Sequence, residues 1–166
     1  MTTDRVPSTT RIFLDSTIFI YHATGVSPQC RALLERCESG DVAGVTSVVV
    51  LAEVAHRLML IEAVAGGFVS GKDVVKKLRA KPDIVRQLHV CQEQVERIPL
   101  MGVNVVPLNV GTLLGSADIR REYGLLVNDS LVVAAARAAG IDRLASADTD
   151  FGRVKGLKVY APGDLG

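Results

Sequence analysis

Short apolar runs alternate with segments of helical length along most of this chain, and this alternation constrains its fold more than any other feature. Each run is too short for a helix and is bounded by polar or turn residues, which is typical of buried strands. Strands that alternate with helices predict an α/β fold with a mainly parallel central sheet between two layers of helices. The expected strands are RIFL (11–14), GVTS (44–47), VNVVPL (103–108), a run within IDRLASAD (141–148) and LKVYAP (157–162).

Capping residues predict where the helices begin and end, because Ser, Thr and Asn favour the N-cap and Gly favours the position after the last turn. Ser27 followed by Pro28 opens one helix, which is expected to end before Gly40. The remaining expected helices are 48–65, capped by Thr46 or Ser47 and stopped at Gly66–Gly67; 109–123, ended by Gly124; and 129–139, with Asn128 as N-cap and Gly140 after its end.

A polar, basic stretch at about residues 68–98 is interpreted as an inserted helical hairpin rather than a second domain. We expect two helices there, separated before Pro82, because proline cannot continue a helix. The chain shows no internal repeat and no low-complexity linker. We therefore expect one domain over residues 11–166, preceded by a flexible tail over residues 1–10.

Composition narrows the class of protein. Aromatic residues make up only 4% of the chain and tryptophan is absent, so Ala, Val, Leu and Ile must build the core, as in parallel α/β proteins. The three cysteines, Cys30, Cys37 and Cys91, lack the spacing of a zinc site, and their odd number argues against a disulfide framework. This favours a reducing, cytoplasmic location. No apolar stretch approaches the ~20 residues that span a membrane.

Several acidic residues stand where the chain should be apolar or where a strand has just ended. Asp15 follows the first strand directly, and Asp148 and Asp150 follow the strand that contains RLAS. Glu53 has Val, Leu and Ala on both sides within its helix, and Asp129 opens the Ala-rich helix. Alone, each has an ordinary explanation: a turn or cap for the aspartates, the helix dipole for Asp129, and a helical ion pair for Glu53.

Taken together, these residues predict one site. Ligands of open parallel sheets bind beyond the carboxyl ends of the strands, where Asp15 and Asp148 lie and where the helices of Glu53 and Asp129 begin. Converging carboxylates repel one another unless a cation compensates their charge. Oxygen ligands select hard cations, so we expect Mg²⁺ or Mn²⁺ in this site.

The order of these acidic elements resembles that of the PIN-domain ribonucleases. The matching pieces, which span residues 11–165, are FLDST after the first strand, SVVVLAEVAHRL after the second, the Ala-rich YGLLVNDSLVVAAARAAGI, and RLASADTDF. The size of the chain resembles that of the VapC-type toxins of VapBC toxin–antitoxin pairs, although the stretch between Met59 and Met101 is longer than in the most compact of them. The resemblance implies the PIN-like three-layer fold.

Carried over by position, the resemblance implies an acidic quartet of Asp15, Glu53, Asp129 and Asp148. The three aspartates would be Mg²⁺ ligands, directly or through water, and Glu53 would be a ligand or would position the attacking water. Ser16 matches the family's small hydroxyl and would orient Asp15 or contact the phosphate. Asp150 is a second candidate for the fourth acidic position, and one-metal and two-metal mechanisms are both open.

The resemblance further implies a metal-dependent endoribonuclease, the toxin of a VapBC-type pair, that forms homodimers and is blocked by a cognate antitoxin protein. The alternatives are a PIN nuclease that is not a toxin and an RNA-binding module with weak or no catalysis. A phosphatase of the haloacid dehalogenase type is disfavoured because DSTIF (15–19) lacks the second Asp of D-x-D-x-[T/V]. A receiver-type regulator is disfavoured because NVVPLN (104–109) offers no Asp to phosphorylate.

The stretch KDVVKKLRAKPDIVR (72–86) carries six Lys or Arg residues against two Asp, a local charge of +4, although the whole chain has a net charge of only +1. A charge run of this kind is usually a solvated helix face. Its place in the inserted hairpin, and its sign opposite to that of the acidic quartet, favour an RNA-binding rim. The candidate contacts are Lys76, Lys77 and Arg79.

Overall fold

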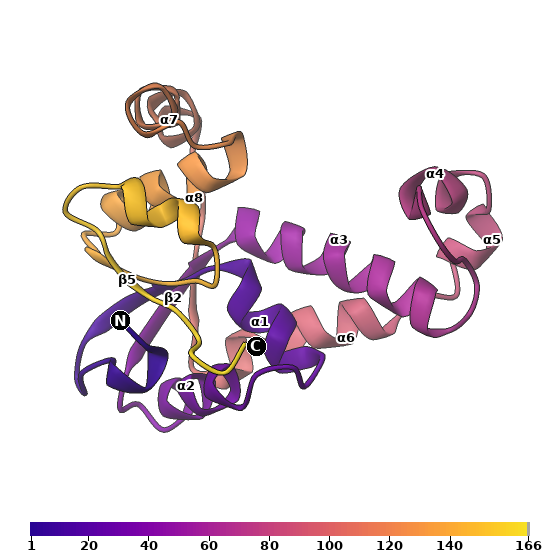
Figure 1. The fold of residues 1–166 in the computed structure, drawn as a ribbon, viewed down its shortest axis with the longest axis horizontal. Helices are drawn as coiled ribbons and strands as arrows, with labels where there is room; N and C mark the ends of the chain where they lie inside the picture. Colours follow the sequence, from indigo (N-terminus) through magenta and orange to yellow (C-terminus); the bar gives the residue numbers. More distant parts are fainter. Residues whose placement is uncertain (166) are drawn as a thin grey trace.

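The computed structural model describes residues 1–165. Its centre is a five-stranded sheet in the order β3-β2-β1-β4-β5, and all four pairings between these strands are parallel. The predicted α/β fold with a parallel sheet is therefore confirmed (Figure 1). The strands are β1 (Arg11–Leu14), β2 (Ala43–Ser47), β3 (Asn104–Val106), β4 (Arg143–Ala145) and β5 (Lys158–Tyr160).

Helices cover both faces of the sheet and form the two outer layers (Figure 1). α7 and α8 lie on one side, and α2 lies on the other, next to α1. The central strand β1 is enclosed on both faces, since Ile12, Phe13 and Leu14 are fully buried, which explains its unbroken apolar sequence. These helices are α1 (Ser16–Ala23), α2 (Pro28–Glu38), α3 (Val48–Ala65), α7 (Val110–Tyr123) and α8 (Val127–Ala138).

Most of the predicted helix ends are confirmed. Ser27 is the N-cap of α2, and its hydroxyl accepts a hydrogen bond from the Cys30 amide at 3.1 Å. Ser47, not Thr46, is the N-cap of α3, and the helix stops at Gly66 as expected. Gly124, after the end of α7, has a positive φ that glycine adopts without strain.

The predicted N-cap of α8 is wrong. Leu126 occupies the N-cap and Asn128 lies inside the first turn. The backbone N–H of Leu126 is close enough to the carboxylate of Asp129, the third residue of the helix, to act to lower its pKa. An acidic side chain at that position can reach back to the N-cap amide, so the helix begins earlier than the sequence of capping residues indicated.

The insertion contains three helices instead of the predicted two: α4 (Val74–Arg79), α5 (Pro82–Val85) and α6 (Val90–Arg97). The break before Pro82 is as expected. The second break comes from Glu62 on α3, whose carboxylate accepts hydrogen bonds from the amides of His89, Val90 and Cys91 at 2.9 to 3.1 Å. These contacts start α6 as a separate helix, which packs along α3 while α4 and α5 form the tip (Figure 1).

The tip has a small apolar cluster of its own. Ala63 of α3, Val69 and Leu78 are its buried members, and Leu60 and Ile84 are among the side chains packed against them. This cluster is separate from the main core beneath and above the sheet. The end of α3 and the tip thus form a unit that projects from the body of the molecule (Figure 1).

The main core contains the side chains that composition predicted. Aliphatic residues dominate it, and Cys30 and Cys37 are buried among them as free thiols. Burial raises the pKa of both thiols to about 11, so they behave as small apolar groups. Within residues 1–165, no helix is both long and apolar enough to cross a membrane.

The first residues differ from the flexible tail that the sequence predicted. Thr2 forms a parallel bridge with Ala161, beside β5, and the amide of Thr3 donates to the carbonyl of Ala161 at 3.1 Å. Thr3 and Val6 are buried, and a short 3₁₀ helix, η1 (Thr3–Arg5), packs against α2. This segment extends the edge of the sheet next to β5.

Candidate active site

The carboxyl ends of β1 and β4 form the edge at which the predicted acidic residues lie. From β1 the chain continues to β2 and β3 on one side, then crosses to β4 and β5 on the other. The β1–β4 boundary is therefore a topological switch point, where a crevice opens beyond the strand ends. Asp15 follows β1 as the N-cap of α1, and Asp148 follows β4 as the N-cap of the 3₁₀ helix η3 (Thr149–Arg153).

Asp15 is almost fully buried, and its two carboxylate oxygens have different surroundings. Oδ2 accepts hydrogen bonds from the hydroxyls of Ser146 at 2.7 Å and Thr17 at 2.9 Å, and a longer one from the Thr17 amide at 3.4 Å. Oδ1 has one contact, with the Ser16 hydroxyl at 3.5 Å. The protein therefore satisfies one oxygen and leaves the other available to a ligand.

The two hydroxyls that hold Asp15 also fix the loop after β4. The Thr17 hydroxyl accepts a hydrogen bond from the Ala147 amide, and the Ser146 hydroxyl accepts one from the Asp148 amide, both at 3.0 Å. Each hydroxyl thus bridges the end of β1 to the segment that carries Asp148. Thr17 was missed at the level of sequence, although its position two residues after an N-cap Asp is a signal for such a contact.

All four residues of the predicted quartet line one cavity of about 280 Å³. Asp15 and Asp148 come from the strand ends, Glu53 from the second turn of α3, and Asp129 from the first turn of α8. The rest of the lining is Ser16, Thr17, Tyr21, Arg57 and Ala147. The structure therefore brings together the residues that the sequence suggested would converge, while their catalytic role stays a prediction.

Two of these carboxyl groups have a raised pKa. Burial raises the pKa of Glu53, and the charges of Asp15 and Asp129 raise it further. Burial also raises the pKa of Asp129, with the charges of Asp148 and Asp15 next in effect. Besides burial, the shared cause is that the carboxylates repel one another. Such a site is stabilised by a proton or by a bound cation.

The structure distinguishes Asp148 from Asp150. Asp148 lines the cavity, and its Oδ1 accepts a hydrogen bond from the Asp150 amide at 2.8 Å. Asp150 does not line the cavity and forms an ion pair with Arg153 at 2.6 Å. Of the two, Asp148 therefore has the geometry expected of the fourth acidic residue.

The donor set fits a hydrated divalent cation. Its oxygens are carboxylates and hydroxyls, which are the groups that Mg²⁺ and Mn²⁺ prefer. Within residues 1–165, no three His, Cys, Asp or Glu side chains converge closely enough to form a complete metal cluster. Mg²⁺ usually keeps several waters and binds through one or two carboxylates, so an open acidic cavity with a free Asp15 oxygen suits it.

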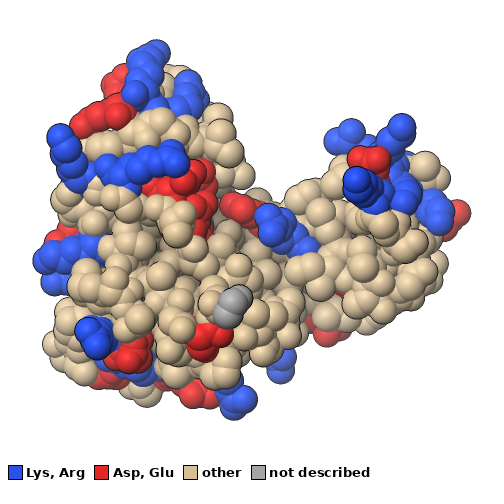
Figure 2. All heavy atoms as spheres, in the orientation of Figure 1, with Lys and Arg blue, Asp and Glu red and all other residues tan. Residues whose placement is uncertain are grey.

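The other candidate residues lie elsewhere. Lys76, Lys77 and Arg79 are on α4, at the far end of α3, and none of them lines the acidic cavity. Figure 2 shows acidic side chains beside a hollow in the molecular surface, and Lys and Arg side chains gathered on the projecting tip across that hollow. Sequence reasoning missed Tyr21 and Arg57 as cavity residues because it had no means of knowing which faces of α1 and α3 meet there.

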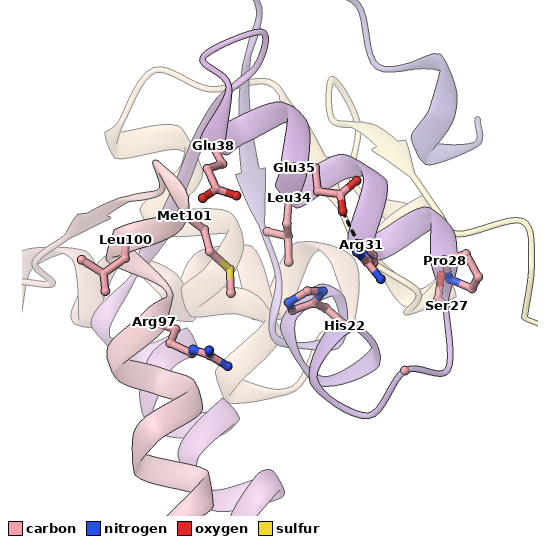
Figure 3. A pocket seen from close by; sticks show the side chains of 11 residues that line it. His22, Ser27, Pro28, Arg31, Leu34, Glu35, Glu38, Arg97, Leu100 and Met101 are labelled. Atoms are coloured by element: carbon pink, nitrogen blue, oxygen red, sulfur yellow. Dashed lines mark hydrogen bonds and ion pairs between the residues drawn. The ribbon is translucent and has the colours of Figure 1, made fainter.

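A larger cavity, of about 600 Å³, lies between α2, α6 and the 3₁₀ helix η2 (Pro99–Met101) (Figure 3). Its charged side chains carry both signs, and Arg31 is already paired with Glu35 at 2.8 Å. Its lining includes none of the candidate site residues that the sequence singled out. Volume alone therefore does not identify the active site, whereas the concentration of like charge does.

Comparisons with known proteins agree with the fold described above. Ribonuclease VapC2 of Methanocaldococcus jannaschii is 28% identical over 149 residues, which cover 90% of this chain and 92% of the relative. VapBC2 from Rickettsia felis, solved with a DNA fragment from its promoter, has a chain with a TM-score of 0.58 and 17% identity, covering 91% of this chain and 98% of that one. VapC20 of Mycobacterium tuberculosis, a toxin that cleaves the sarcin–ricin loop, gives a TM-score of 0.57 at 17% identity, covering 85% and 92%.

At these identities the solved structures show a shared fold. The sequence profile of the PIN domain matches residues 12–157, which is most of the chain and includes every residue of the acidic cavity. On that match, the chain belongs to the PIN domain family.

Proposed function

We propose that this protein is a metal-dependent endoribonuclease and the toxin of a VapBC-type pair. One observation carries the proposal: carboxylates from four separate segments surround a single cavity at the switch point of a PIN-type sheet. A purely structural role does not account for this, because neighbouring carboxylates raise the pKa of Glu53 and of Asp129, and among residues 1–165 the cavity is lined by one Arg and no Lys.

The relatives support the substrate and the partner. The curated relative that covers most of this chain is named a ribonuclease of the VapC type. The structural neighbours include a toxin–antitoxin complex from Klebsiella pneumoniae, whose matched chain is 18% identical with a TM-score of 0.55. We therefore assign RNA as the substrate of this chain and an antitoxin protein as its partner, with residues 11–166 acting as one PIN domain.

In this function, Asp15, Asp129 and Asp148 would hold Mg²⁺ or Mn²⁺, directly or through water, and the Asp15 oxygen that has only the long contact with the Ser16 hydroxyl would be the one offered to the ion. The bound ion supplies activation of water and relief of negative charge on the phosphodiester. Ser146 and Thr17 keep Asp15 in place. The hydrogen bonds that they make stay inside the protein, so this ligand is oriented before RNA arrives.

Glu53 is the candidate that handles the proton of the attacking water. Its raised pKa suits a general base, because proton transfer is most efficient when the pKa of the base approaches the working pH. Arg57, one turn later on α3, lines the same cavity and is the cation best placed to contact a phosphate. Ser16 is next to both acids: its hydroxyl contacts Asp15 Oδ1 at 3.5 Å and acts to lower the pKa of Glu53.

The test is cleavage of a mixed-sequence single-stranded RNA with Mg²⁺ or Mn²⁺. Glu53→Gln keeps the shape of the side chain and removes its charge, so we expect a folded protein whose cleavage rate falls about 100-fold or more, as for loss of a general base. Asp150→Asn is the matched control: it removes a nearby charge outside the cavity lining and should keep activity within about twofold of wild type.

Two results would contradict the proposal. One is wild-type protein, separated from any antitoxin, that binds RNA and cuts none of it with either metal; the chain would then be an RNA-binding module. The other is Glu53→Gln protein with wild-type activity, which would remove Glu53 from the site.

A further inference from the structure

The proposed active site leaves the most strongly charged surface of the molecule unexplained. The tip of the hairpin, made of α4, α5 and their loops, carries six Lys or Arg residues against two Asp within residues 72–86. All eight of these side chains are exposed. No Asp or Glu of the acidic cavity pairs with them within residues 1–165.

The tip lies over the same face of α3 as the acidic cavity. Glu53, Arg57 and Leu60 follow one another at spacings of four and three, which places them on one side of the helix. Glu53 and Arg57 line the cavity, whereas Leu60 packs against the cluster of Val69 and Leu78 beneath the tip. The cavity and the tip therefore border the same hollow, which Figure 2 shows between the two lobes of the molecule.

The separation along α3 determines how the tip can act. Glu53 and Ala63, which belongs to the tip cluster, are ten residues apart on one helix, about 15 Å at 1.5 Å per residue. At physiological salt the screening length is about 8 Å, so the charges at the tip have little effect through solvent on a ligand confined to the cavity. They act by contact with a ligand long enough to reach them.

The available cations differ from those that the sequence suggested at one position, because the side chain of Lys77 is engaged within the tip. Lys77 and Lys81 donate to the backbone carbonyls of Ser70 and Phe68, and thus hold the loop of the tip together. Arg86 is paired with Asp83.

Three other cations at the tip, Lys72, Lys76 and Arg79, have no hydrogen-bond or ion-pair partner within residues 1–165. They are exposed, and Lys76 and Arg79 are one turn apart on α4. These three are free to bind phosphates.

We propose that the tip is a second RNA-contacting element, which binds the phosphates of a substrate that extends beyond the cavity through Lys72, Lys76 and Arg79. At a rise of about 3.4 Å per stacked nucleotide, 15 Å corresponds to about four nucleotides between the cleaved bond and the tip. Phosphate contacts position an RNA without reading its sequence, so the tip favours long substrates over short ones. The proposal rests on the proposed function only in taking RNA as the ligand.

Binding is tested without cleavage, in EDTA, with a fluorescein-labelled 20-nucleotide oligouridine followed by anisotropy between 50 and 200 mM KCl. The triple variant Lys72→Gln, Lys76→Gln, Arg79→Gln loses three phosphate contacts. Each contact contributes about 0.7 to the slope of log affinity against log salt concentration, so this slope should become shallower by about 2. Over this fourfold range of salt, wild type should lose about 20-fold more affinity than the variant. Lys76→Gln alone, which leaves most of the tip unchanged, should lower the slope by about 0.7.

A control variant with Arg5, Arg31 and Lys158 replaced by Gln changes the net charge equally, on η1, α2 and β5. Its salt slope should match that of wild type. A triple tip variant with the wild-type slope, or a control variant with an equally reduced slope, would overturn the proposal.

Cleavage tests the dependence on length. Two RNAs of 6 and 20 nucleotides share the same cleaved sequence at their centre, taken from a site that wild type cuts in a longer RNA. The triple tip variant should lose about tenfold in kcat/KM on the longer RNA and less than twofold on the shorter. Equal losses on both RNAs would refute the assignment. If wild type cuts no RNA, the proposed function fails, and the salt slope still decides whether the tip binds RNA.

Discussion

Replacing Ser146 by Ala tests whether the site is held together by the hydroxyls around Asp15. Ser146 is fully buried, and its hydroxyl both donates to Asp15 Oδ2 at 2.7 Å and accepts from the Asp148 amide at 3.0 Å. A hydrogen bond to a charged group contributes about 1.5–3 kcal/mol, and leaving the half-buried Asp148 amide without its acceptor costs toward the lower end of about 1–3 kcal/mol. The expected loss is about 4 kcal/mol, which for a chain of this size lowers Tm by about 10 °C.

The assay is urea and thermal unfolding of the metal-free protein, followed by circular dichroism. Ser116→Ala is the matched control: Ser116 is also buried, but its hydroxyl donates only to the Leu113 carbonyl within α7, so its loss should change stability by less than about 1 kcal/mol. The Mg²⁺-induced rise in Tm should also shrink in Ser146→Ala, because Asp15 is no longer fixed. Equal stability of the two variants would refute the reasoning, since the network would then contribute nothing.

Three further predictions concern the charges and the surface. Asp129→Asn should raise the Tm of the metal-free protein, because burial and neighbouring charges disfavour this carboxylate, and should reduce the rise caused by Mg²⁺; a lower metal-free Tm would contradict this. Burial acts to raise the pKa of Glu62, but the amides of Cys91, Val90 and His89 lower it on balance. The ionised Glu62 carboxylate therefore stabilises the hairpin fully above the ordinary carboxyl pKa, and this stabilisation is lost as the pH falls through the lowered pKa of Glu62. Amide hydrogen exchange in residues 74–97 should accelerate on acidification more in wild type than in Glu62→Gln. Finally, the apolar side chains of Val110, Leu114 and Leu126 are 70%, 69% and 75% exposed, so we expect the 17.7 kDa chain to form homodimers. Light scattering should show dimers for wild type and monomers for the double variant Leu114→Glu, Leu126→Glu. A strictly monomeric wild type would count against the dimer.

The sequence was sufficient to predict the structure where the contacts that determine it are made between residues close together in the chain. The N-cap of α2 depends on Ser27 and an amide three residues later, and the burial of β1 follows from its own apolar side chains. The convergence of Asp15 and Asp148 was also predictable, because the ends of neighbouring parallel strands meet at one edge.

The sequence failed where a distant side chain decides the outcome. α6 has His89 as its N-cap because Glu62, 27 residues earlier, accepts a hydrogen bond from the His89 amide, and no local signal marks that break. Thr17 belongs to the site because it meets Ala147 across 130 residues. Which of Lys76 and Lys77 is free depends on the path of the loop at Ser70. In each case the missing information is the tertiary arrangement, that is, which residues far apart in the sequence meet in the fold.

The separate apolar cluster under the tip has an evolutionary consequence. Its buried members are all supplied by α3 and the insertion, and none belongs to the core around the sheet. We expect substitutions or changes of length at the tip to leave the strand ends that hold the carboxylates undisturbed, since α3 is the element against which α4 packs. The tip, which is proposed to bind RNA, is therefore able to change its sequence rapidly in evolution, while the acidic cavity stays under strict constraint.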